Sequence, residues 1–542
     1  IDLVRKTELQ PLADSRGNDR LDYLRGDRQF EQRNTGTSGA SFRNRAIDNV
    51  LGDFVSSAPV FVGAPDGRFG TVIPEASSYL AFRTSQAGRA ETLYAGSNDG
   101  MLHAFDAVTG AERWAFVPGV VFKNLHNLTN PTYSHEYFVD GAATVGDAFV
   151  GGGWKTYLVS GLNAGGQSVF ALDITNPTAA SEAGVASKFR WEFTDSNDAD
   201  LGYTYSRPAI ARMANGTWVA IFGNGYNNTV PDGNVSTTGN AVLYVVRLSD
   251  GVLLRKIDTG VGMAQDHYGI GRPNGLSTVG VVDANQDAIA DYAYGGDLFG
   301  NVWKFDLTST NPSLWKVAYG SGTVKTPLYV AKDSLGLRQP ITGRPVVGRG
   351  PGGDGLMVLF GTGKFLEARD RIPSNLQAHT FYGLLDQNTG LVADLISDRS
   401  ELLQQTITFE GPVTVSNTEI VAGAPVVTTT TAKARVTSQN ALTTQRGWYL
   451  DLESPVNGFQ GEMVPSNAFL RNKRVNFTTL IPDPDPCTYG GSSWLMNIDM
   501  FSGGRIDTSP FDLNGDGEFD NEDKVPPGGG PSALGGNVAV SG

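Results

Sequence analysis

The sequence has little cysteine, little positive charge and no long apolar segment. Its 542 residues include one cysteine, Cys487, so a disulfide framework within the chain is excluded. Lys and Arg number 42 against 56 Asp and Glu, which gives a net charge of −14. Because binding to a nucleic-acid backbone needs clustered Lys and Arg, this charge argues against a nucleic-acid partner. No apolar run approaches the ~18 residues that span a bilayer as a helix, so no transmembrane segment is predicted.

Patterns typical of enzyme sites are also sparse. The five histidines are scattered and include no i, i+4 pair of the kind that binds zinc. Cys487 has no nearby histidine, no Gly-x-Ser-x-Gly turn occurs, and no glycine-rich loop has the phosphate-binding form. Paired carboxylates for glycoside hydrolysis stay open, because such residues are neighbours in space rather than in sequence. We predict that the chain is not an enzyme.

What the sequence does contain is a large supply of short apolar segments. Hydrophobic residues make up 40% of the chain and glycine accounts for 68 residues, which is enough apolar material for a large core. Beyond residue 50, short runs of Val, Ile, Tyr, Phe and Trp are interrupted by Gly, Asn, Asp and Pro about every 8 to 12 residues, the pattern of an all-β protein.

One turn pattern recurs along the chain. An apolar or aromatic strand ends in Asp, or once in Arg, and a turn with Ser or Thr and Gly or Pro follows. Repeats of four strands at this spacing are typical of propeller blades. The sequence therefore predicts an all-β, seven-bladed, modified β-propeller; a β-sandwich with accidental turn similarity is the alternative. The turns lie 48 to 80 residues apart and begin at Asp106, Asp173, Arg247, Asp306, Asp386, Asp451 and Asp499.

The two ends of the chain differ from the blade pattern. Residues 1–50 are predicted to form a short, partly helical segment, and the propeller is expected to cover residues 51–511, with residues 415–447 as an insertion. Residues 512–542 are predicted to hold an acidic calcium loop and then a flexible Gly/Pro tail. Since the chain begins at Ile1 without an initiator Met or a signal peptide, we expect it to be part of a longer or processed protein.

The spacing of acidic residues in the segment 283–291 predicts a calcium site. Calcium takes six to eight oxygen ligands, and three crowded carboxylates would repel one another without a cation. The flanking residues 279–282 and 292–295 are predicted strands, so the loop is expected to be a hairpin turn rather than a helix-flanked EF-hand. A solvated Asn/Asp-rich turn is the alternative. The predicted ligands at positions 1, 3, 5, 7 and 9 are Asp283, Asn285, Asp287, the Ile289 carbonyl and Asp291.

A second candidate calcium loop covers residues 512–523. It matches the EF-hand formula, with Gly at position 6, except that Asp replaces the usual Glu at position 12. A merely soluble acidic tail is the alternative. The predicted ligands are Asp512, Asn514, Asp516, the Glu518 carbonyl, Asp520 and Asp523.

Arg25, Gly26 and Asp27 form the Arg-Gly-Asp tripeptide that integrins recognise, which makes them candidate receptor-binding residues. The same residues also have a structural interpretation. The preceding residues 22–24 look like a helix end, for which Gly26 would serve as the C′ residue.

Together these features resemble the C-terminal propeller domain of the PilY/PilC family, the type IV pilus tip-associated adhesins and biogenesis factors. The resemblance covers nearly the whole chain, and residues 283–291 match the calcium site of the family position for position. In this family a variable N-terminal region precedes the propeller, which fits the start at Ile1. The loop 512–523 is not part of the family pattern. The matching segments are the seven turns and residues 23–27, 51–53, 57–63, 283–291 and 487–494.

The resemblance implies Ca2+ as the bound ion and export to the bacterial cell surface, at the pilus tip or the outer membrane. It also implies calcium-linked control of pilus extension and retraction, and hence a role in twitching motility and virulence. Expected partners are pilins or minor pilins and, for host-cell attachment, a host integrin or another host surface receptor.

Two other functions stay open. Residues 96–114 resemble the tryptophan-docking repeat of quinoprotein dehydrogenases, but those enzymes usually have eight blades and an adjacent cysteine pair, which one cysteine cannot supply. The other alternative is a purely structural propeller scaffold whose calcium loops only hold hairpins together.

Overall fold

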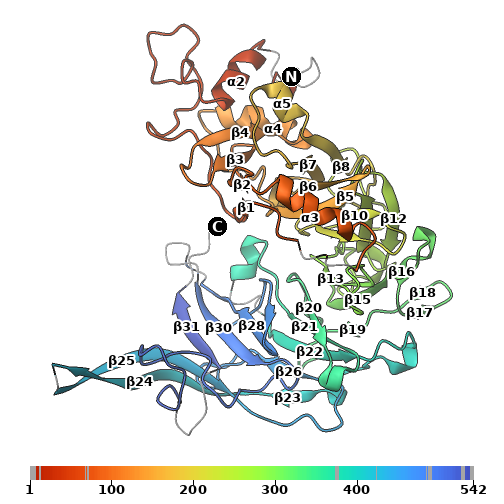
Figure 1. Cartoon of the computed structure of the whole chain (residues 1–542), viewed down its shortest axis with the longest axis vertical. Coiled ribbons are helices and arrows are strands. Elements are labelled where there is room, and N and C mark those ends of the chain that lie inside the picture. The colour runs from red at the N-terminus through yellow and green to blue at the C-terminus, as the bar shows by residue number, and fades with distance from the viewer. Residues whose placement is uncertain are drawn as a thin grey trace. The chain divides into compact units, whose positions relative to one another are not determined.

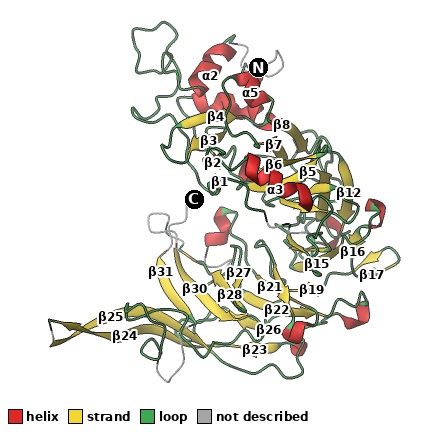
Figure 2. Ribbon diagram, in the orientation of Figure 1, coloured by secondary structure: helices red, strands yellow, loops and turns green. Residues whose placement is uncertain are grey.

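The computed structural model describes residues 8–10, 14–67, 69, 72–372, 377–422, 424–483, 485, 491–525 and 532–537. Strands dominate, as Figures 1 and 2 show, and the all-β prediction is confirmed. No helix in these ranges is both long and apolar enough to cross a membrane. By their contacts the residues form two compact units. The first comprises Ile1–Leu276, Asp283–Asp291 and Leu307–Trp315, and the second comprises Ser277–Val282, Tyr292–Asp306 and Lys316–Gly542.

The first unit contains three four-stranded antiparallel sheets. In each, consecutive strands are hydrogen-bonded in chain order, which is the arrangement of a propeller blade. The first sheet is β1 Val60–Val62, β2 Thr92–Gly96, β3 Leu102–Asp106 and β4 Glu112–Phe116; the second is β5 Thr144–Val150, β6 Gly153–Gly161, β7 Ser168–Asp173 and β8 Phe189–Thr194; the third is β9 Ala209–Arg212, β10 Trp218–Gly223, β11 Val242–Arg247 and β12 Leu253–Asp258.

Short helices lie before, within and between these sheets in chain order. The predicted N-terminal helix is α2, and α3 precedes β2 in the first sheet. The helices are α2 Gly17–Leu24, α3 Ala76–Ser85, α4 Phe122–Leu125 and α5 Glu182–Ala186, with 3-10 turns at Gly119–Val121, His126–Thr129, Asn163–Gly165, Met263–Gln265 and Pro312–Leu314.

The recurring Asp is the residue that closes the β3–β4 and β7–β8 turns. Asp106 Oδ1 accepts the N–H groups of Val108 and Thr109, both at 2.9 Å, and Asp173 Oδ1 accepts the N–H of Thr175 at 3.1 Å. A short carboxylate can hold a turn in this way because it reaches the backbone two residues on. The turn repeat therefore marks the end of the third strand in each of these sheets.

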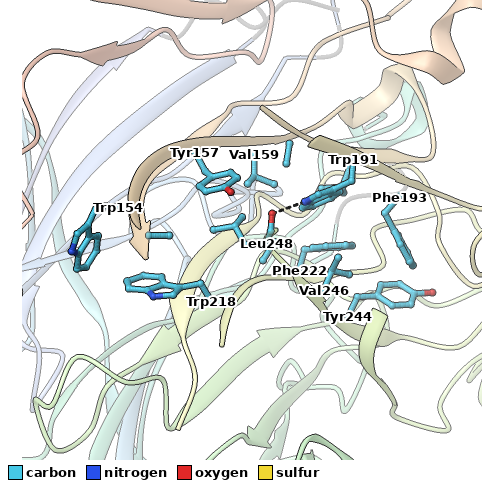
Figure 3. Close-up of a cluster of buried hydrophobic side chains, with 14 of the residues drawn as sticks. Trp154, Tyr157, Val159, Trp191, Phe193, Trp218, Phe222, Tyr244, Val246 and Leu248 are labelled. Atoms are coloured by element: carbon cyan, nitrogen blue, oxygen red, sulfur yellow. Dashed lines mark hydrogen bonds between the residues drawn. The ribbon is translucent and has the colours of Figure 1, made fainter. Parts of the chain in front are cut away.

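A side chain on the last strand of each sheet in the first unit bonds to the turn of the next sheet. Trp114 Nε1 donates to the Pro177 carbonyl at 2.7 Å, and Trp191 Nε1 donates to the Leu248 carbonyl at 2.8 Å, the bond drawn in Figure 3. In the third sheet the equivalent residue is Arg255. In all three sheets this position lies next to a shift in the pairing register of the last two strands. The Arg255 Nε donates to a carbonyl in the next turn, that of Trp315, at 3.0 Å.

Aromatic side chains of the second and third sheets form much of one buried core cluster of the first unit (Figure 3). Trp154 stacks in a T-shaped arrangement on Trp218 with ring centroids 5.9 Å apart, and Phe222 and Tyr244 are completely buried. Each large aromatic side chain buries about 150–250 Å² of surface, so this cluster contributes strongly to the packing of the two sheets against each other.

The second unit contains sheets of less regular composition. The fourth sheet is β13 Gly280–Val282, β14 Tyr292–Gly296, β15 Asn301–Asp306 and β16 Lys316–Val317, with β19 Tyr329–Val330 on β15; the fifth is β20 Val346–Arg349, β21 Leu356–Gly361, β22 Thr380–Asp386, β26 Gly447–Asp451 and β23 Leu403–Gln405; the sixth is β24 Ile407–Val421, β25 Ala424–Thr437, β31 Ala533–Asn537, β30 Gly491–Asp499, β28 Arg474–Thr478 and β27 Phe469–Arg471, with β29 Ile481–Pro482 on β30.

Small elements complete this unit, and the predicted insertion is visible in it. A long hairpin, β24–β25, contains most of residues 415–447. The remaining elements are the hairpin β17 Gly320–Ser321 and β18 Val324–Lys325, and 3-10 turns at Pro351–Gly353, Ala368–Arg371, Val392–Asp394 and Arg399–Glu401.

A buried charged cluster links the fourth and fifth sheets. Lys304 and Asp386 form an ion pair of 2.7 Å with both side chains 1% exposed. The Tyr294 hydroxyl donates to the same Asp386 oxygen at 2.7 Å. Burial lowers the pKa of Lys304, which the Asp386 charge partly opposes. A buried ion pair of this kind is stable only when its remaining hydrogen-bonding groups are satisfied. Here the Tyr294 hydroxyl satisfies one of them.

The seven predicted turns fall within six sheets. The turns at Asp386 and Asp451 end β22 and β26, and these two strands are antiparallel partners in the fifth sheet. Within the described residues, six sheets of four or more strands are present. The prediction of seven blades is therefore not confirmed by the sheet count.

The prediction of a flexible tail in residues 512–542 is wrong for Ala533–Asn537. This segment forms β31, which pairs with both β30 and β25. Its glycine content is the reason that it fits, because a Cβ on Gly535 would come within 3.0 Å of the Trp494 ring. Glycine at position 535 thus leaves room for the ring of Trp494, its partner on the neighbouring strand.

Candidate metal centre

The loop 283–291 joins β13 to β14, whose residues Val282 and Tyr292 are antiparallel partners. It is therefore the hairpin turn that the sequence predicts. Its second half is anchored within the first unit. The Ala290 N–H donates to the Arg212 carbonyl at 2.9 Å, and the Asp291 carbonyl accepts the Leu307 N–H at 2.9 Å. These two backbone bonds hold the end of the loop within the first unit.

The first half of this loop winds around the Asp283 carboxylate. Its Oδ1 accepts the N–H groups of Gln286 at 2.6 Å and Asp287 at 3.1 Å, and its Oδ2 accepts the N–H of Ala288 at 2.7 Å. Gln286 and Ala288 have positive φ angles of 68° and 62°. Two left-handed residues so close together are costly for side chains other than glycine, which shows how strongly the carboxylate determines this path.

The other predicted side-chain ligands lie along the same turn. Asn285 Oδ1 accepts the Asp287 N–H at 3.0 Å, and Asn285 Nδ2 lies 3.1 Å from Asp287 Oδ2. Asp287 Oδ1 accepts the N–H of Ile289 at 2.9 Å. Asp291 Oδ2 accepts the Ala284 N–H at 2.9 Å and so closes the loop. The structure thus brings these four side chains together in one short turn.

The loop 512–523 repeats the geometry of the first seven residues. Asp512 accepts the N–H groups of Gly515 at 2.7 Å and Gly517 at 2.9 Å, and both glycines have positive φ angles, 77° and 86°. Asn514 Oδ1 accepts the Asp516 N–H at 3.2 Å, and Asn514 Nδ2 donates to Asp516 Oδ2 at 2.9 Å. The N–H of Glu518 in turn donates to Asp516 Oδ1 at 2.7 Å.

The two loops differ in the residue that closes them. Asp523, at position 12, accepts the Leu513 N–H at 2.6 Å, which is the bond that Asp291 makes from position 9 of the first loop. Asp523 is completely buried, whereas Asp520 lies on the surface, where its N–H donates to Asp523 Oδ2 at 3.1 Å and its Oδ1 accepts the Glu522 N–H at 2.7 Å. Matching the loops by position number therefore pairs Asp291 with the wrong residue.

Hydrophobic residues fix the ends of the second loop. Leu513 is 4% exposed and Val525 is 1% exposed, and both pack with the valines of the β24–β25 hairpin. This anchoring, together with the buried Asp523, holds residues 512–523 against the β24–β25 hairpin of the sixth sheet.

Electrostatics favour a cation in the first loop. Burial, with smaller contributions from the charges of Asp287 and Asp283, raises the pKa of Asp291. Among the described residues, no three Asp, Glu, His or Cys side chains already converge as a preformed metal site. Asp283 uses three of the roughly four lone-pair sites of an ionised carboxylate, so capacity for a cation remains. A donor set of carboxylate, amide and carbonyl oxygens fits a hard ion such as Ca2+.

The Arg-Gly-Asp tripeptide lies at the C-terminal end of α2. The Gly26 N–H donates to the Tyr23 carbonyl at 2.9 Å, and the Asp27 N–H donates to the Asp22 carbonyl at 2.9 Å. Gly26 has a φ of 104°. These two bonds and the left-handed residue between them form a Schellman motif, so Gly26 is the C′ residue of this helix.

The two charged side chains of the tripeptide are exposed but not equally free. The Arg25 guanidinium is paired with Glu182 at the start of α5. Asp27 accepts only the N–H of Gln29 at 2.6 Å through its side chain. A receptor that required both charges would have to displace Glu182 from Arg25.

Cys487 lies outside the described residues.

Comparison with known proteins places this chain in a family. A model of the PilY1 beta-propeller domain matches residues 51–419. The type IV pilus biogenesis factor PilY1 of Pseudomonas aeruginosa strain PAO1 is 36% identical over 573 residues, covering 100% of this chain and 45% of that protein. A PilY1 homolog of Xylella fastidiosa is 38% identical over 500 residues, covering 90% of this chain and 31% of that protein. The chain therefore spans less than half the length of these curated relatives.

A solved structure supports the same assignment and the fold. The crystal structure of the Pseudomonas aeruginosa PilY1 C-terminal domain superposes with a TM-score of 0.70 and 32% sequence identity, covering 89% of this chain and 94% of that one. The β-propeller prediction is thereby confirmed, as is the resemblance to the PilY family. Because the family match covers residues 51–419 and the identity extends along the whole chain, this chain belongs to the PilY1 β-propeller domain family.

Proposed function

We propose that this chain is the calcium-binding propeller domain of a type IV pilus biogenesis factor. Its relatives along the whole chain are named as such factors, which supports a place at the bacterial cell surface, at the pilus tip or the outer membrane. Pilins or minor pilins would be its partners. The names of the relatives give no support to the quinoprotein dehydrogenase alternative.

The shared geometry of the two acidic loops is the observation that supports calcium. Their sequences differ at positions 2, 4, 6, 7 and 8, yet positions 1, 3 and 5 carry Asp, Asn and Asp in both. In both loops the side chain at position 1 accepts the N–H groups of positions 4 and 6, that at position 3 accepts the N–H of position 5, and that at position 5 accepts the N–H of position 7. Both loops have left-handed residues at positions 4 and 6. A common path with a common set of oxygen donors is what a shared ligand would select.

Calcium bound at residues 283–291 would act on the connection between β13 and β14. The ion would offset the repulsion among Asp283, Asp287 and Asp291 and hold the turn closed. It would regulate pilus extension and retraction, and hence twitching motility, only if one state of the protein binds it better than another. The structural scaffold alternative differs only in this regulation: in it, calcium holds the hairpins together and does not control the pilus.

Calorimetric titration of Ca2+ tests the binding proposal. We expect two sites in the wild-type chain, with Asp287→Ala removing one and Asp516→Ala removing the other. Asp250→Ala is a matched control, because Asp250 is a turn carboxylate that pairs with Arg247 at 2.8 Å outside both loops. If Asp287→Ala and Asp516→Ala both bind as the wild type does, the calcium proposal fails.

Assays of the full-length protein in cells separate regulation from scaffolding. Asp287→Ala should reduce surface pili and twitching motility under conditions in which the protein is still folded. If this variant lowers only the melting temperature, while piliation and motility are unchanged, the scaffold alternative holds instead.

Host-cell attachment through Arg25, Gly26 and Asp27 needs its own test. Asp27→Glu keeps the charge and the exposed position but lengthens the side chain, so it should abolish binding to a purified integrin while leaving the helix end intact. Equal binding by the wild type and this variant would remove the tripeptide from the proposed function.

A further inference from the structure

A cavity of about 290 Å³ lies between the N-terminal segment and the first sheet, within the first compact unit. Its walls come from residues 23–24 at the end of α2, from 43–53, from the β2–β3 turn at 98–99, and from 128–135. None of these residues belongs to either acidic loop. The cavity has room for a ligand of about the size of a monosaccharide or a dipeptide.

Within the described part of the chain, Arg43 is the arginine of this cavity that has no anionic partner. Its guanidinium packs over the Tyr133 ring at 4.3 Å, and its Nε is buried without a hydrogen-bond partner. The neighbouring Arg45, in contrast, is paired with Glu31 at 2.9 Å. An arginine carries five donors in a fixed planar fork and cannot lose its charge, so an unpaired one favours an oxyanion ligand.

Asn98 provides a second unpaired donor from a different wall. Its side chain is 3% exposed, and its Oδ1 accepts the Phe138 N–H at 3.0 Å, which fixes the orientation of the amide. The Nδ2 that remains is buried and has no partner. A buried donor without an acceptor costs about 1–3 kcal/mol, so a ligand acceptor here would be favourable.

The two acidic residues of the cavity are already engaged. Asp53 pairs with His135 at 2.8 Å, and Asp99 pairs with His103 at 3.1 Å. They leave Arg43 free to bind a ligand, but they would still repel a strongly charged one. A carboxylate with one negative charge therefore fits better than a phosphate with nearly two.

We propose that this cavity binds a small ligand through a single carboxylate group, held by Arg43 with Asn98 as a second hydrogen-bond donor. The carboxylate could belong to an acidic sugar or to the C-terminus of a peptide, and both present the same group to the guanidinium. Planar bidentate pairing of guanidinium and carboxylate gives the selectivity. This proposal does not depend on calcium binding.

Ligand-observed NMR and calorimetry on the intact chain test the proposed carboxylate site with two pairs of ligands, each an acid and its neutral partner. The pairs are glucuronate against glucose, and N-acetyl-glycylglycine against its C-terminal amide. We expect at least one acid to bind at least about tenfold more tightly than its neutral partner, the size of a lost charged hydrogen bond. The pair that shows this difference identifies the source of the carboxylate. No binding of either acid at about 10 mM, or equal binding of each acid and its neutral partner, overturns the proposal.

A second test compares the variant Arg43→Gln with the control variant Arg33→Gln. Arg33 is close in sequence and pairs with Glu31 at 2.8 Å, but it does not line the cavity. Arg43→Gln should reduce acid binding to the level of the neutral partner, whereas Arg33→Gln should leave it unchanged. Unchanged acid binding in a folded Arg43→Gln chain overturns the assignment of Arg43. If that variant does not fold, the comparison of acid and neutral ligands on the wild-type chain still decides.

Discussion

The side chain of His103 lies between two carboxylates on the first sheet. Its Nδ1 is 2.6 Å from Glu112 and its Nε2 is 3.1 Å from Asp99. Burial alone would lower the pKa of His103, but the hydrogen bonds to Asp99 and Glu112 outweigh it and raise the pKa to about 9. The histidine is therefore a cation in the folded chain at neutral pH, and its charge belongs to the structure rather than to a pH switch.

This pair of contacts predicts how stability changes with pH. The folded-state pKa of about 9 is above the usual value of 6.5, so His103 stabilises the fold fully below about pH 6.5 and loses this effect as pH rises through 9. Relative to His103→Gln, the wild-type free energy of unfolding should fall by on the order of 2 kcal/mol over that window, allowing for solvent at the half-exposed Glu112. Urea unfolding at a series of pH values measures it.

Glu112→Gln is the control for this prediction. With one of the two carboxylates neutral, the decline should be smaller than in the wild type. Parallel stability curves for the wild type and His103→Gln from pH 6 to 10 would contradict the assigned protonation.

Single residues also show the limit of motif reading. The structure shows what Trp114 and Trp191 do, because each indole bonds to the turn of the next sheet. Arg255 performs the same role in the third sheet. The sequence does not reveal this role of Arg255, because the position requires only a side chain with an N–H donor and not a tryptophan.

At the scale of structural elements, the acidic loops show how one local motif can be closed in two ways. The first seven residues of each are determined by Asp, Asn and Asp at alternate positions. The closing carboxylate is Asp291 in one loop and Asp523 in the other. The first loop enters β14 three residues after position 7, whereas the second loop continues for several more residues.

This difference predicts unequal roles for the acids of the second loop. Asp523→Asn should weaken Ca2+ binding by at least about tenfold and lower the melting temperature even without calcium, because it replaces a buried acceptor of backbone N–H groups. Asp520→Asn, on the surface, should change either quantity much less. Calorimetry and thermal melting of the two variants measure this, and a larger effect for Asp520→Asn would show that position 9 is the closing residue.

The blade turns provide a second test at this scale. Gly110 and Gly251 occupy equivalent turn positions with almost the same φ, 74° and 75°. A Cβ at Gly110 would meet nothing within 4 Å, whereas a Cβ at Gly251 would come within 2.7 Å of Trp191. The pair therefore separates backbone strain from interference with the docked indole.

Alanine at each position should show this separation. Gly110→Ala should cost about 1 kcal/mol of unfolding free energy, the strain of a left-handed alanine. Gly251→Ala should cost about 1–3 kcal/mol more, because the methyl group must displace Trp191. Urea unfolding in the presence of calcium gives both values. Equal losses would mean that the indole moves aside without cost.

At the scale of the whole molecule, each of the two compact units contains one of the two candidate calcium loops. The loop 283–291 has its contacts in the first unit, and the loop 512–523 lies in the second. A net charge of −14 also favours binding of a divalent cation at any site that can arrange its oxygens.

Calcium should therefore stabilise the entire chain. A ligand that binds only the folded state stabilises it according to its free concentration, so 1 mM Ca2+ should raise the melting temperature relative to EGTA by roughly a few degrees. Asp287→Ala and Asp516→Ala should each remove part of the shift, and the double variant should remove all of it. Calorimetric scans measure this; an unchanged wild-type melt in EGTA, or a full shift in the double variant, would contradict the two-loop proposal.

The sequence by itself determined the features that depend on neighbouring residues. These are the short strands, the Asp that closes the β3–β4 and β7–β8 turns, Gly26 at the end of α2, and the path of residues 283–291. Each rests on hydrogen bonds between groups a few residues apart, so the local order of residues is sufficient.

Only the tertiary structure decided the features that depend on distant residues. The bond from Trp191 to Leu248 joins residues 57 positions apart, and that from Asn98 to Phe138 joins residues 40 apart. The grouping of seven turns into six sheets, the pairing of β31 and the cavity beside Arg43 arise in the same way. Their energy comes from packing and from pairing buried donors, and the sequence does not show which distant groups will meet.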